Sequence, residues 1–233
     1  MSQSRPTLIV FCREPVARRT KTRLIGALTP AGAAALSDAF IRDALAKAVV
    51  VRPSQIVIAA GAPGGAERSK YFQRLSRRFG AGLIDQGSGS LGQRMAHALE
   101  PFLSRGALLI GTDTPSLPTA LLAASLEALR RTRVVIAPSL DGGYYAVGVR
   151  AAMPPIFTGI RWGTCRVFAS TIRRLKRAGI RYALGPAWYD VDRWGDLMLL
   201  AAHLRLLARS RNRTPCPATE LVLKRLGLLR HAR

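Results

Sequence analysis

Carboxylates stand at the ends of predicted strands in this sequence, a placement that suits a divalent cation and the phosphates it carries. In an open α/β sheet, ligands bind beyond the carboxyl ends of the strands, and Mg²⁺ or Mn²⁺ is held there by carboxylate oxygens. The chain has only 13 acidic residues among 233. Several of them at one sheet edge therefore indicate a functional site. Each candidate follows a predicted strand or the turn after it: Asp113, Asp141, Asp190 and Asp192.

Asp113 is the central candidate of this set. The apolar run Ala107–Ile110 is typical of a buried strand, and Thr114-Pro115 disfavours its continuation. We therefore expect Asp113 at the carboxyl end of a strand, well placed to hold a divalent cation. The simpler alternative is a turn in which the carboxylate accepts a hydrogen bond from its own backbone.

A basic loop follows the first predicted strand, Thr7–Cys12. Its residues, Arg13–Leu24, carry five positive charges and one negative charge. Lys21 and Arg23 stand just before or within the first turn of the next segment, where cationic side chains and free N–H groups can bind phosphate. The alternative is a loop whose charges are simply solvated.

A flexible loop, Gln86–Gly92 (QGSGSLG), leads into another predicted helix. Its glycines would let the backbone approach a ligand closely. Gly87, Gly89 and Gly92 have GxGxxG spacing, but the loop does not follow the first predicted strand, where a dinucleotide-binding enzyme has this motif, and it is not a P-loop. Gln86 could read a base edge and Arg94 could meet a phosphate. Loop flexibility alone is the competing explanation.

The remaining acids also have simpler structural explanations. Asp141 precedes Gly142 and Gly143, whose backbone can adopt geometries barred to other residues, so this turn is a candidate substrate platform. A tight hairpin would explain the same residues. Asp192 could either bind metal or cap the helix predicted to begin at Trp194.

Other catalytic chemistries find less support in the sequence. The chain contains neither an HExxH motif nor a GxSxG motif, and no GxGxxG follows the first predicted strand. The pattern instead favours metal-assisted phosphoryl or nucleotidyl transfer, in which Lys21 and Arg23 balance phosphate charge and catalysis is mostly positioning plus electrostatics. The histidines lie in predicted helices or the tail, without metal-ligand spacing: His97, His203 and His231.

The elements that must position these residues alternate between strand and helix. This alternation predicts an α/β fold, with a mostly parallel sheet between two layers of helices. The expected strands are Thr7–Cys12, Gln55–Ala60, Leu83–Asp85, Ala107–Ile110, Val134–Ala137, Tyr144–Val149 and Ile180–Leu184. The expected helices are Ala31–Val50, Ala66–Phe79, Leu91–Leu103, Pro118–Arg131, Arg166–Ala178 and Trp194–Ala208.

The composition narrows the class of protein and leaves several partners open. A formal charge of +23 attracts nucleotides, nucleic acid and anionic membrane surfaces without choosing among them, although aromatic interleaving for specific nucleic-acid binding is missing. No apolar run approaches the roughly 20 residues that span a bilayer.

An odd number of widely spaced cysteines, Cys12, Cys165 and Cys216, is typical of reduced thiols, so we expect a cytoplasmic protein. We expect one domain over residues 1–210 and a basic tail over 211–233 that could include a helix.

Six motifs in order resemble those of a known bacterial group. Together they are similar to glycosyltransferase-A (GT-A) superfamily proteins of the radical-SAM/selenodomain-associated transferase 1 type, distant relatives of the phospholactate and molybdenum-cofactor guanylyltransferases. The match spans about Thr7 to Leu197. Members of this group usually have Pro-Gly where this chain has Ala17-Arg18. The motifs are FCREPVARRTKTRL, IDQGSGSLGQRM, LIGTDTPSL, APSLDGGYYAVGV, IFTGIRWGT and YDVDRWGDL.

The resemblance implies a nucleotide-diphosphosugar-transferase fold with a Rossmann-like nucleotide-binding half. It makes Asp113 the main Mg²⁺ or Mn²⁺ ligand, with Asp190 or Asp192 as a second. It also assigns the remaining site residues to two sides of the site. The nucleotide side comprises Lys21, Arg23, Gln86, Gly92 and Arg94, and the acceptor or sugar side comprises Asp141, Gly142, Gly143 and Tyr144.

The sequence thus predicts a metal-dependent transferase that uses a nucleoside triphosphate or nucleotide-sugar and a small acceptor. Nucleotidyl transfer to a phosphorylated or hydroxyl acceptor is favoured, because Lys-Thr-Arg after the first strand resembles a triphosphate-binding loop. Asp113, Lys21 and Arg23 are the expected catalytic residues. Glycosyl transfer from a nucleotide-sugar is the first alternative, and non-catalytic binding of a nucleotide or polyanion is the second.

Overall fold

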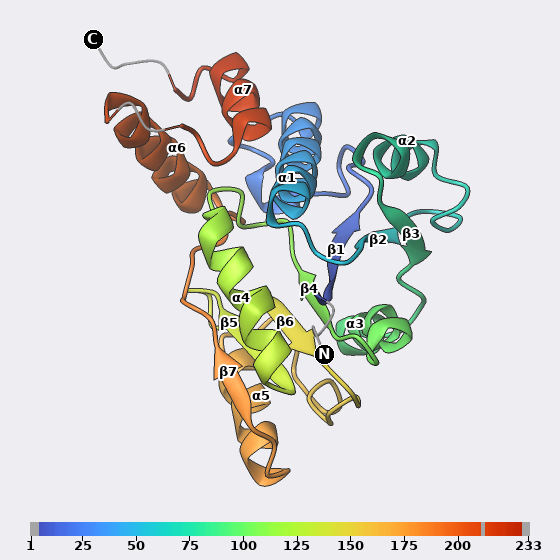
Figure 1. Ribbon diagram of the computed structural model, residues 1–233. Coiled ribbons are helices and arrows are strands. Elements are labelled where there is room, and N and C mark those ends of the chain that lie inside the picture. Colours follow the sequence, from blue (N-terminus) through green and yellow to red (C-terminus); the bar gives the residue numbers. More distant parts are fainter. Residues whose placement is uncertain (1–4, 211–212, 230–233) are drawn as a thin grey trace.

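A computed structural model describes residues 5–210 and 213–229 of the chain. Within these residues, one sheet of seven strands has the order β3-β2-β1-β4-β6-β5-β7 (Figure 1). β6 runs antiparallel to both of its neighbours, and the other pairs are parallel. The strands are β1 (Thr7–Arg13), β2 (Ile56–Gly61), β3 (Gly82–Asp85), β4 (Ala107–Ile110), β5 (Val134–Pro138), β6 (Tyr144–Val149) and β7 (Tyr182–Leu184).

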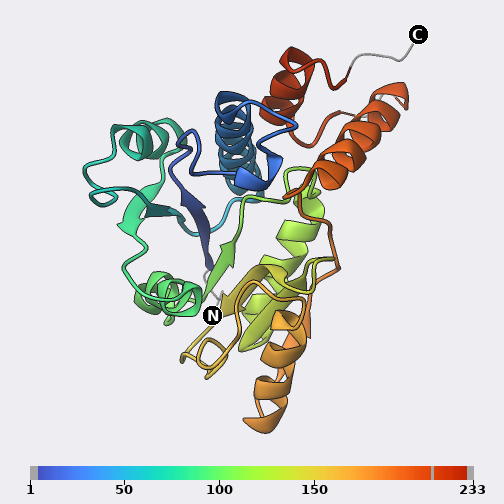
Figure 2. The same ribbon diagram turned by 180° about the vertical axis from the view of Figure 1, so that it is seen from behind.

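Helices cover both faces of this sheet and make three layers. Side chains of α1, α2 and α4 pack in the core on one face, whereas those of α3 and α5 pack on the other. Figure 1 shows the face of the sheet that α4 covers. Figure 2, turned by 180°, shows the opposite face with α5. The bounds are α1 (Pro30–Val51), α2 (Lys70–Phe79), α3 (Leu91–Leu99), α4 (Thr119–Arg131), α5 (Val167–Arg177), α6 (Trp194–Arg209) and α7 (Pro217–Arg225), with 3₁₀ turns at Thr22–Leu24 and Glu100–Phe102.

The first strand shows why its sequence is apolar without interruption. Leu8 and Val10 enter the core on the α1 face, whereas Ile9 enters the core on the α3 face, and all three are fully buried. Successive side chains of a strand point to opposite faces, so a central strand under two helical layers needs an apolar residue at every position. The α/β fold and the three-layer, mostly parallel sheet predicted from the sequence are confirmed.

Two helices are each four residues shorter than predicted, and each has a local reason. α2 begins at Lys70 rather than Ala66 because Ser69 caps it, its Oγ accepting a hydrogen bond from the Phe72 N–H at 3.3 Å. α3 ends at Leu99 rather than Leu103, where a 3₁₀ turn containing Pro101 takes over. Proline has no N–H to continue an α-helical hydrogen-bond pattern.

The C-terminal segment packs against α1 and α6 through an apolar cluster that includes Phe40, Leu200 and Leu223. α7 lies beside α1 in both views (Figures 1 and 2). Part of the predicted tail, residues 211–212 and 230–233, lies outside the described residues, and the division at residue 210 stays a prediction. Among the described helices, none is both long and apolar enough to cross a bilayer.

Candidate active site

A cleft of about 1090 Å³ opens at the carboxyl edge of the central strands. It is formed by the loop after β1, the loop after β4, the turn before β6, and the segments that lead into α5 and α6. This volume is slightly above the usual range for small-molecule sites, which gives room for a nucleotide and an acceptor together. Eight of the residues predicted to act in the site line it: Lys21, Arg23, Asp113, Asp141, Gly143, Tyr144, Asp190 and Asp192.

An ion pair between Lys21 and Asp113 joins two walls of this cleft. The Nζ of Lys21 lies 2.7 Å from Oδ1 of Asp113, and it also donates a hydrogen bond of 2.7 Å to the carbonyl of Val191. The lysine side chain is 6% exposed and the aspartate side chain is 50% exposed. Lys21 itself has left-handed backbone geometry at φ 48°. The lysine is therefore held inside the wall, while the carboxylate stays open to a ligand.

Asp192 and Arg23 form a second ion pair across the same cleft. The other oxygen of Asp192 lies 3.7 Å from the Lys21 Nζ. Asp192 does not cap α6, because the Asp196 carboxylate accepts the N–H groups of Asp192 and Arg193 at 3.0 and 2.7 Å. The capping alternative for Asp192 is therefore wrong, and its side chain is free to order the two cations.

Asp190 lies among other carboxylates in a half-buried position. Burial, and after it the nearby charge of Asp141, raise the pKa of Asp190 to about 6, with smaller contributions from Asp196 and Asp113. Carboxylates crowded in this way repel one another, and a bound cation relieves that repulsion. The negative side of the cleft thus has the electrostatic character of a cation site.

The donor set fits a cation that arrives together with a nucleotide. Within the described part of the chain, no group of three His, Cys, Asp or Glu side chains is arranged to hold a metal by itself. Mg²⁺ is commonly held by one or two carboxylates, with substrate phosphates and water completing the shell. Asp113 and Asp190 each bring a carboxylate to the cleft, so its lining is compatible with a cation held in part by nucleotide phosphates.

The turn before β6 forms another part of the cleft wall, near Asp190. The Asp141 carboxylate accepts a hydrogen bond from the Gly143 N–H at 2.8 Å and another from the Ser139 hydroxyl. Gly142 adopts φ +87°, and a Cβ there would come within 2.1 Å of the Cys165 carbonyl oxygen. Glycine is therefore required for this turn to pack against the segment before α5. Tyr144 lines the cleft next to the turn.

Gln86 is placed behind the cleft wall and does not line the cleft. It is 1% exposed, and its Nε2 donates to the carbonyls of Cys12 and Ala59 at 2.9 and 2.8 Å. These contacts tie together the ends of β1 and β2. Reading of a base by Gln86 stays a prediction that this packing does not favour.

Gly92 and Arg94 also sit behind residues that line the cleft. A Cβ on Gly92 would lie 2.5 Å from the Phe157 carbonyl and 2.7 Å from the Trp162 ring, so this glycine permits close packing. The Arg94 guanidinium lies 5.4 Å from the centre of the Phe11 ring, and burial, followed by the charge of Arg13, lowers its pKa. Both residues support the wall of the cleft, and their predicted contact with a nucleotide stays a prediction.

The structure adds a cleft residue that the sequence alone did not single out. Trp162 lines the cleft and packs edge-to-face on Tyr144, with ring centroids 6.3 Å apart. Its only sequence signal is an aromatic residue in an irregular, glycine-containing segment. An aromatic wall of this kind offers a flat apolar surface to a ring of the ligand.

Comparison with solved structures reveals similarity along the whole chain. A provisionally named nucleotide-diphospho-sugar transferase from Desulfovibrio desulfuricans G20 has a TM-score of 0.81 at 27% identity, covering 98% of this chain and 97% of that chain. A 4-diphosphocytidyl-2C-methyl-D-erythritol synthase from Anaerococcus prevotii DSM 20548 has a TM-score of 0.58 at 9% identity, covering 87% and 97%. A CMP:2-keto-3-deoxy-manno-octonic acid synthetase complexed with CTP has a TM-score of 0.55 at 12% identity, covering 86% and 98%. The last two show the fold alone, which is that of nucleotidyltransferases.

The family comparison concerns the middle of the chain. Residues 44–164, just over half of the sequence, match the family described as uncharacterized protein conserved in bacteria (DUF2064). Comparison with curated proteins gave no match. The chain belongs to the DUF2064 family.

Proposed function

We propose that this member of the DUF2064 family is a metal-dependent nucleotidyltransferase that joins a nucleoside triphosphate to a small phosphorylated or hydroxyl acceptor. The observation that carries the proposal is the Lys21–Asp113 ion pair of 2.7 Å in a cleft of about 1090 Å³. Arg23, Asp190 and Asp192 line the same cleft. Two cationic side chains that can bind phosphate therefore face a set of carboxylates that can bind a divalent ion.

In this proposal Lys21 and Arg23 bind the β- and γ-phosphates. Their present partners, Asp113 and Asp192, hold both cations in the cleft before the nucleotide arrives. Asp113, with Asp190 or Asp192 as a second ligand, would hold Mg²⁺ or Mn²⁺. The bound ion would neutralise phosphate oxygens and the charge of the leaving pyrophosphate.

The proposed reaction is an in-line displacement at phosphorus. An acceptor oxygen attacks the α-phosphorus and forms a new P–O bond, while the bond between the α-phosphorus and the α–β bridging oxygen breaks. The electron pair leaves with pyrophosphate, and a proton from a hydroxyl acceptor passes to the surrounding water or a carboxylate. Lys21 and Arg23 stabilise the charge on the leaving group, so this chain contributes mainly positioning and electrostatics. Asp141, Gly143 and Tyr144 would orient the acceptor.

Glycosyl transfer is the second candidate, and one comparison favours it. The similar D. desulfuricans protein, at 27% identity over nearly the whole chain, is named for nucleotide-diphospho-sugar transfer. The same cations would then stabilise a departing nucleoside diphosphate. The ordered motifs support the radical-SAM/selenodomain-associated transferase 1 type, and the reduced cysteines support a cytoplasmic location.

Product analysis separates the candidates. A panel of nucleoside triphosphates and nucleotide-sugars is incubated with phosphorylated and hydroxyl acceptors and Mg²⁺ or Mn²⁺. Nucleotidyl transfer releases pyrophosphate, whereas glycosyl transfer releases a nucleoside diphosphate. Asp113→Asn should abolish either product, and turnover that survives this substitution undiminished would overturn both reactions.

Nucleotide binding tests the third candidate, a non-catalytic polyanion-binding protein, which the formal charge of +23 favours. Thermal shifts are measured with each nucleotide, with and without Mg²⁺ or Mn²⁺. A transferase should be stabilised by nucleotide and metal together. Steeply salt-dependent binding of nucleic acid, without any metal-linked nucleotide effect, would support the third candidate instead.

A further inference from the structure

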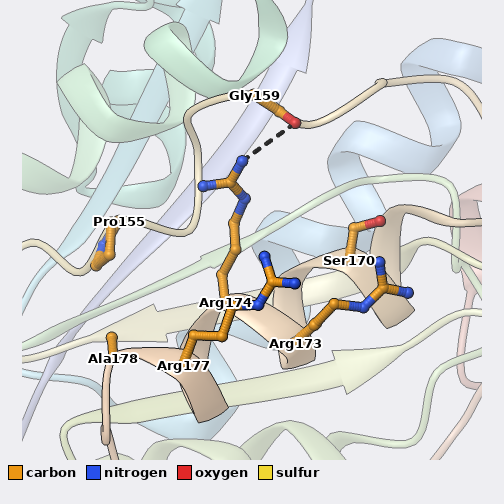
Figure 3. A pocket seen from close by; sticks show the side chains of 7 residues that line it. All are labelled: Pro155, Gly159, Ser170, Arg173, Arg174, Arg177 and Ala178. Carbon is orange, nitrogen blue, oxygen red and sulfur yellow. Dashed lines mark hydrogen bonds between the residues drawn. The ribbon is translucent and has the colours of Figure 1, made fainter.

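A second hollow lies away from the cleft, between α5 and the segment that leads into it (Figure 3). Its volume is about 380 Å³. We call it the arginine pocket, and none of the residues that line it also lines the cleft. Its walls include Pro155, Gly159, Ser170, Arg173, Arg174 and Arg177.

The pocket gathers positive charge from one side of α5. Ser170, Arg173, Arg174 and Arg177 follow the three- and four-residue spacing that places side chains on one helix face, and Figure 3 shows them beneath the segment with Gly159. The opposite side of α5 is fixed in the core by Val167, Thr171 and Leu175. The buried side therefore fixes α5 in place, and the arginines lie on the side of the helix that faces outward.

The described part of the chain forms no ion pair with the arginines of the pocket, Arg173, Arg174 and Arg177. The sequence from Gly142 to Tyr189 contains eight Lys or Arg and no Asp or Glu. Guanidinium groups brought together in this way repel one another unless an anion lies between them.

The pocket is also shaped around one of its arginines. The Arg174 Nη2 donates a hydrogen bond of 3.3 Å to the Gly159 carbonyl, which orients the guanidinium. Gly159 adopts φ +61°, and a Cβ there would lie 2.6 Å from the same nitrogen. Glycine adopts this left-handed φ without steric cost, so it suits the turn that presents its carbonyl to Arg174. This arrangement distinguishes the pocket from a surface with solvated, freely moving arginines.

We infer that the arginine pocket is a second ligand site, which binds the phosphomonoester group of an anionic molecule. The planar guanidinium fork matches phosphate oxygens, and several such groups bind a dianion better than a monoanion. The Ser170 hydroxyl can donate a further hydrogen bond. A volume of about 380 Å³ is within the range of small-molecule sites, so it accommodates a phosphate and a small body attached to it.

The phosphomonoester can come from a soluble metabolite or from a lipid headgroup, and two probes distinguish these sources. Binding of glycerol 3-phosphate to the full chain is measured by isothermal titration calorimetry. Co-sedimentation is measured with phosphatidylcholine vesicles that do or do not contain phosphatidic acid. Saturable binding of either probe that depends on the pocket supports the inference and identifies the source.

The decisive comparison uses two pairs of substitutions with equal charge and spacing. Arg174→Gln/Arg177→Gln removes two guanidinium groups from the pocket. Arg74→Gln/Arg77→Gln removes two exposed ones from α2, three residues apart as in the pocket pair. We expect the dissociation constant to rise about tenfold or more for the pocket pair and less than about twofold for the α2 pair, since one good charge-assisted contact is worth about a factor of ten.

Two further variants make the result decisive. Ser170→Asp introduces a carboxylate into the pocket and should weaken binding about as much, even if the double variant folds poorly. Arg23→Gln, in the cleft, should leave this binding event intact. Equal weakening by the pocket and α2 pairs would show a general charge effect and overturn the inference. Absence of saturable binding of both probes to the unmodified protein would overturn it as well.

Discussion

The Nζ of Lys21 lies 2.7 Å from Oδ1 of Asp113, and this ion pair joins the loop after β1 to the loop after β4. The lysine is almost fully buried, whereas the aspartate is half exposed. A phosphate that enters the cleft can therefore take over the lysine while the carboxylate turns to a cation. Under the proposed function, the pair would keep the phosphate-binding lysine and the metal-binding carboxylate next to each other.

Replacement of Lys21 tests this role most directly. We expect Lys21→Met to lower turnover by about 10²-fold or more, because the charge that balances the leaving group is lost. Pyrophosphate or nucleoside diphosphate release is measured under saturating metal. The matched control is Lys224→Met, which breaks the surface pair with Glu220 on α7. Equal activity of the two variants would contradict the role of Lys21.

Substitution of Asp190 should make stability depend less on pH. The pKa of Asp190 is raised from 3.8 to about 6, so between these values the folded chain keeps a proton that the unfolded chain has released. The free energy of unfolding therefore falls as pH rises from about 4 to about 6. Asp190→Asn removes this loss, and we expect a gain of about 1 kcal/mol at about pH 8, allowing for solvent screening, and none at about pH 4.

Urea unfolding at both pH values, without divalent cations, measures this effect. The exposed Glu67 offers a control, since Glu67→Gln should change stability little at either pH. A gain for Asp190→Asn that is equal at both pH values would show that charge at this position is not its cause.

Asp43 should be essential for the docking of α7. Its carboxylate accepts the N–H groups of Ala218 and Thr219 at 2.9 and 2.8 Å and the Thr219 hydroxyl at 2.6 Å. The neighbouring Lys47 is 5% exposed and donates to the Pro115 carbonyl in the loop after Asp113. Asp43→Ala leaves these two N–H groups and the buried hydroxyl without their acceptor, so we expect a loss of about 3 kcal/mol of stability.

The same variant should also loosen the C-terminal helix. Amide hydrogen exchange across α7 is expected to speed up more than exchange in β1. Glu220→Ala removes only a surface pair from α7 and should cost less than about 1 kcal/mol. If both variants unfold at the same urea concentration, Asp43 contributes no more to stability than the surface pair of Glu220.

Two glycines at matched helix positions should respond oppositely to alanine. Gly92 and Gly195 are each the second residue of their helices, α3 and α6. A Cβ on Gly92 meets the Phe157 carbonyl at 2.5 Å, whereas one on Gly195 meets nothing within 4 Å. We expect Gly92→Ala to destabilise the protein by about 2 kcal/mol, since the wall near Trp162 must shift. Gly195→Ala should instead stabilise it by about 0.5–1 kcal/mol, and thermal unfolding of both variants tests the contrast.

Local pattern in the sequence determined the elements and the edge at which the acids collect. The strands Ala107–Ile110 and Tyr144–Val149 were predicted with the bounds that the structure has, because buried strands require unbroken apolar runs and turn residues end them. The position of Asp113 after β4 follows from the same signals. Helix ends were less predictable where a cap or proline acted, as at Ser69 and Pro101.

Tertiary structure alone decided which charges meet. Lys21 pairs with Asp113, and Arg23 pairs with Asp192, across segments that are far apart in the sequence. Asp196, rather than Asp192, takes the capping role because of the direction of its side chain. Local spacing specifies none of these contacts. Gln86 shows the same limit, since a polar residue in a glycine-rich loop is packed beneath the cleft wall. Periodicity indicates which residues of an element are buried, whereas the partner of a polar side chain depends on how the whole chain is folded.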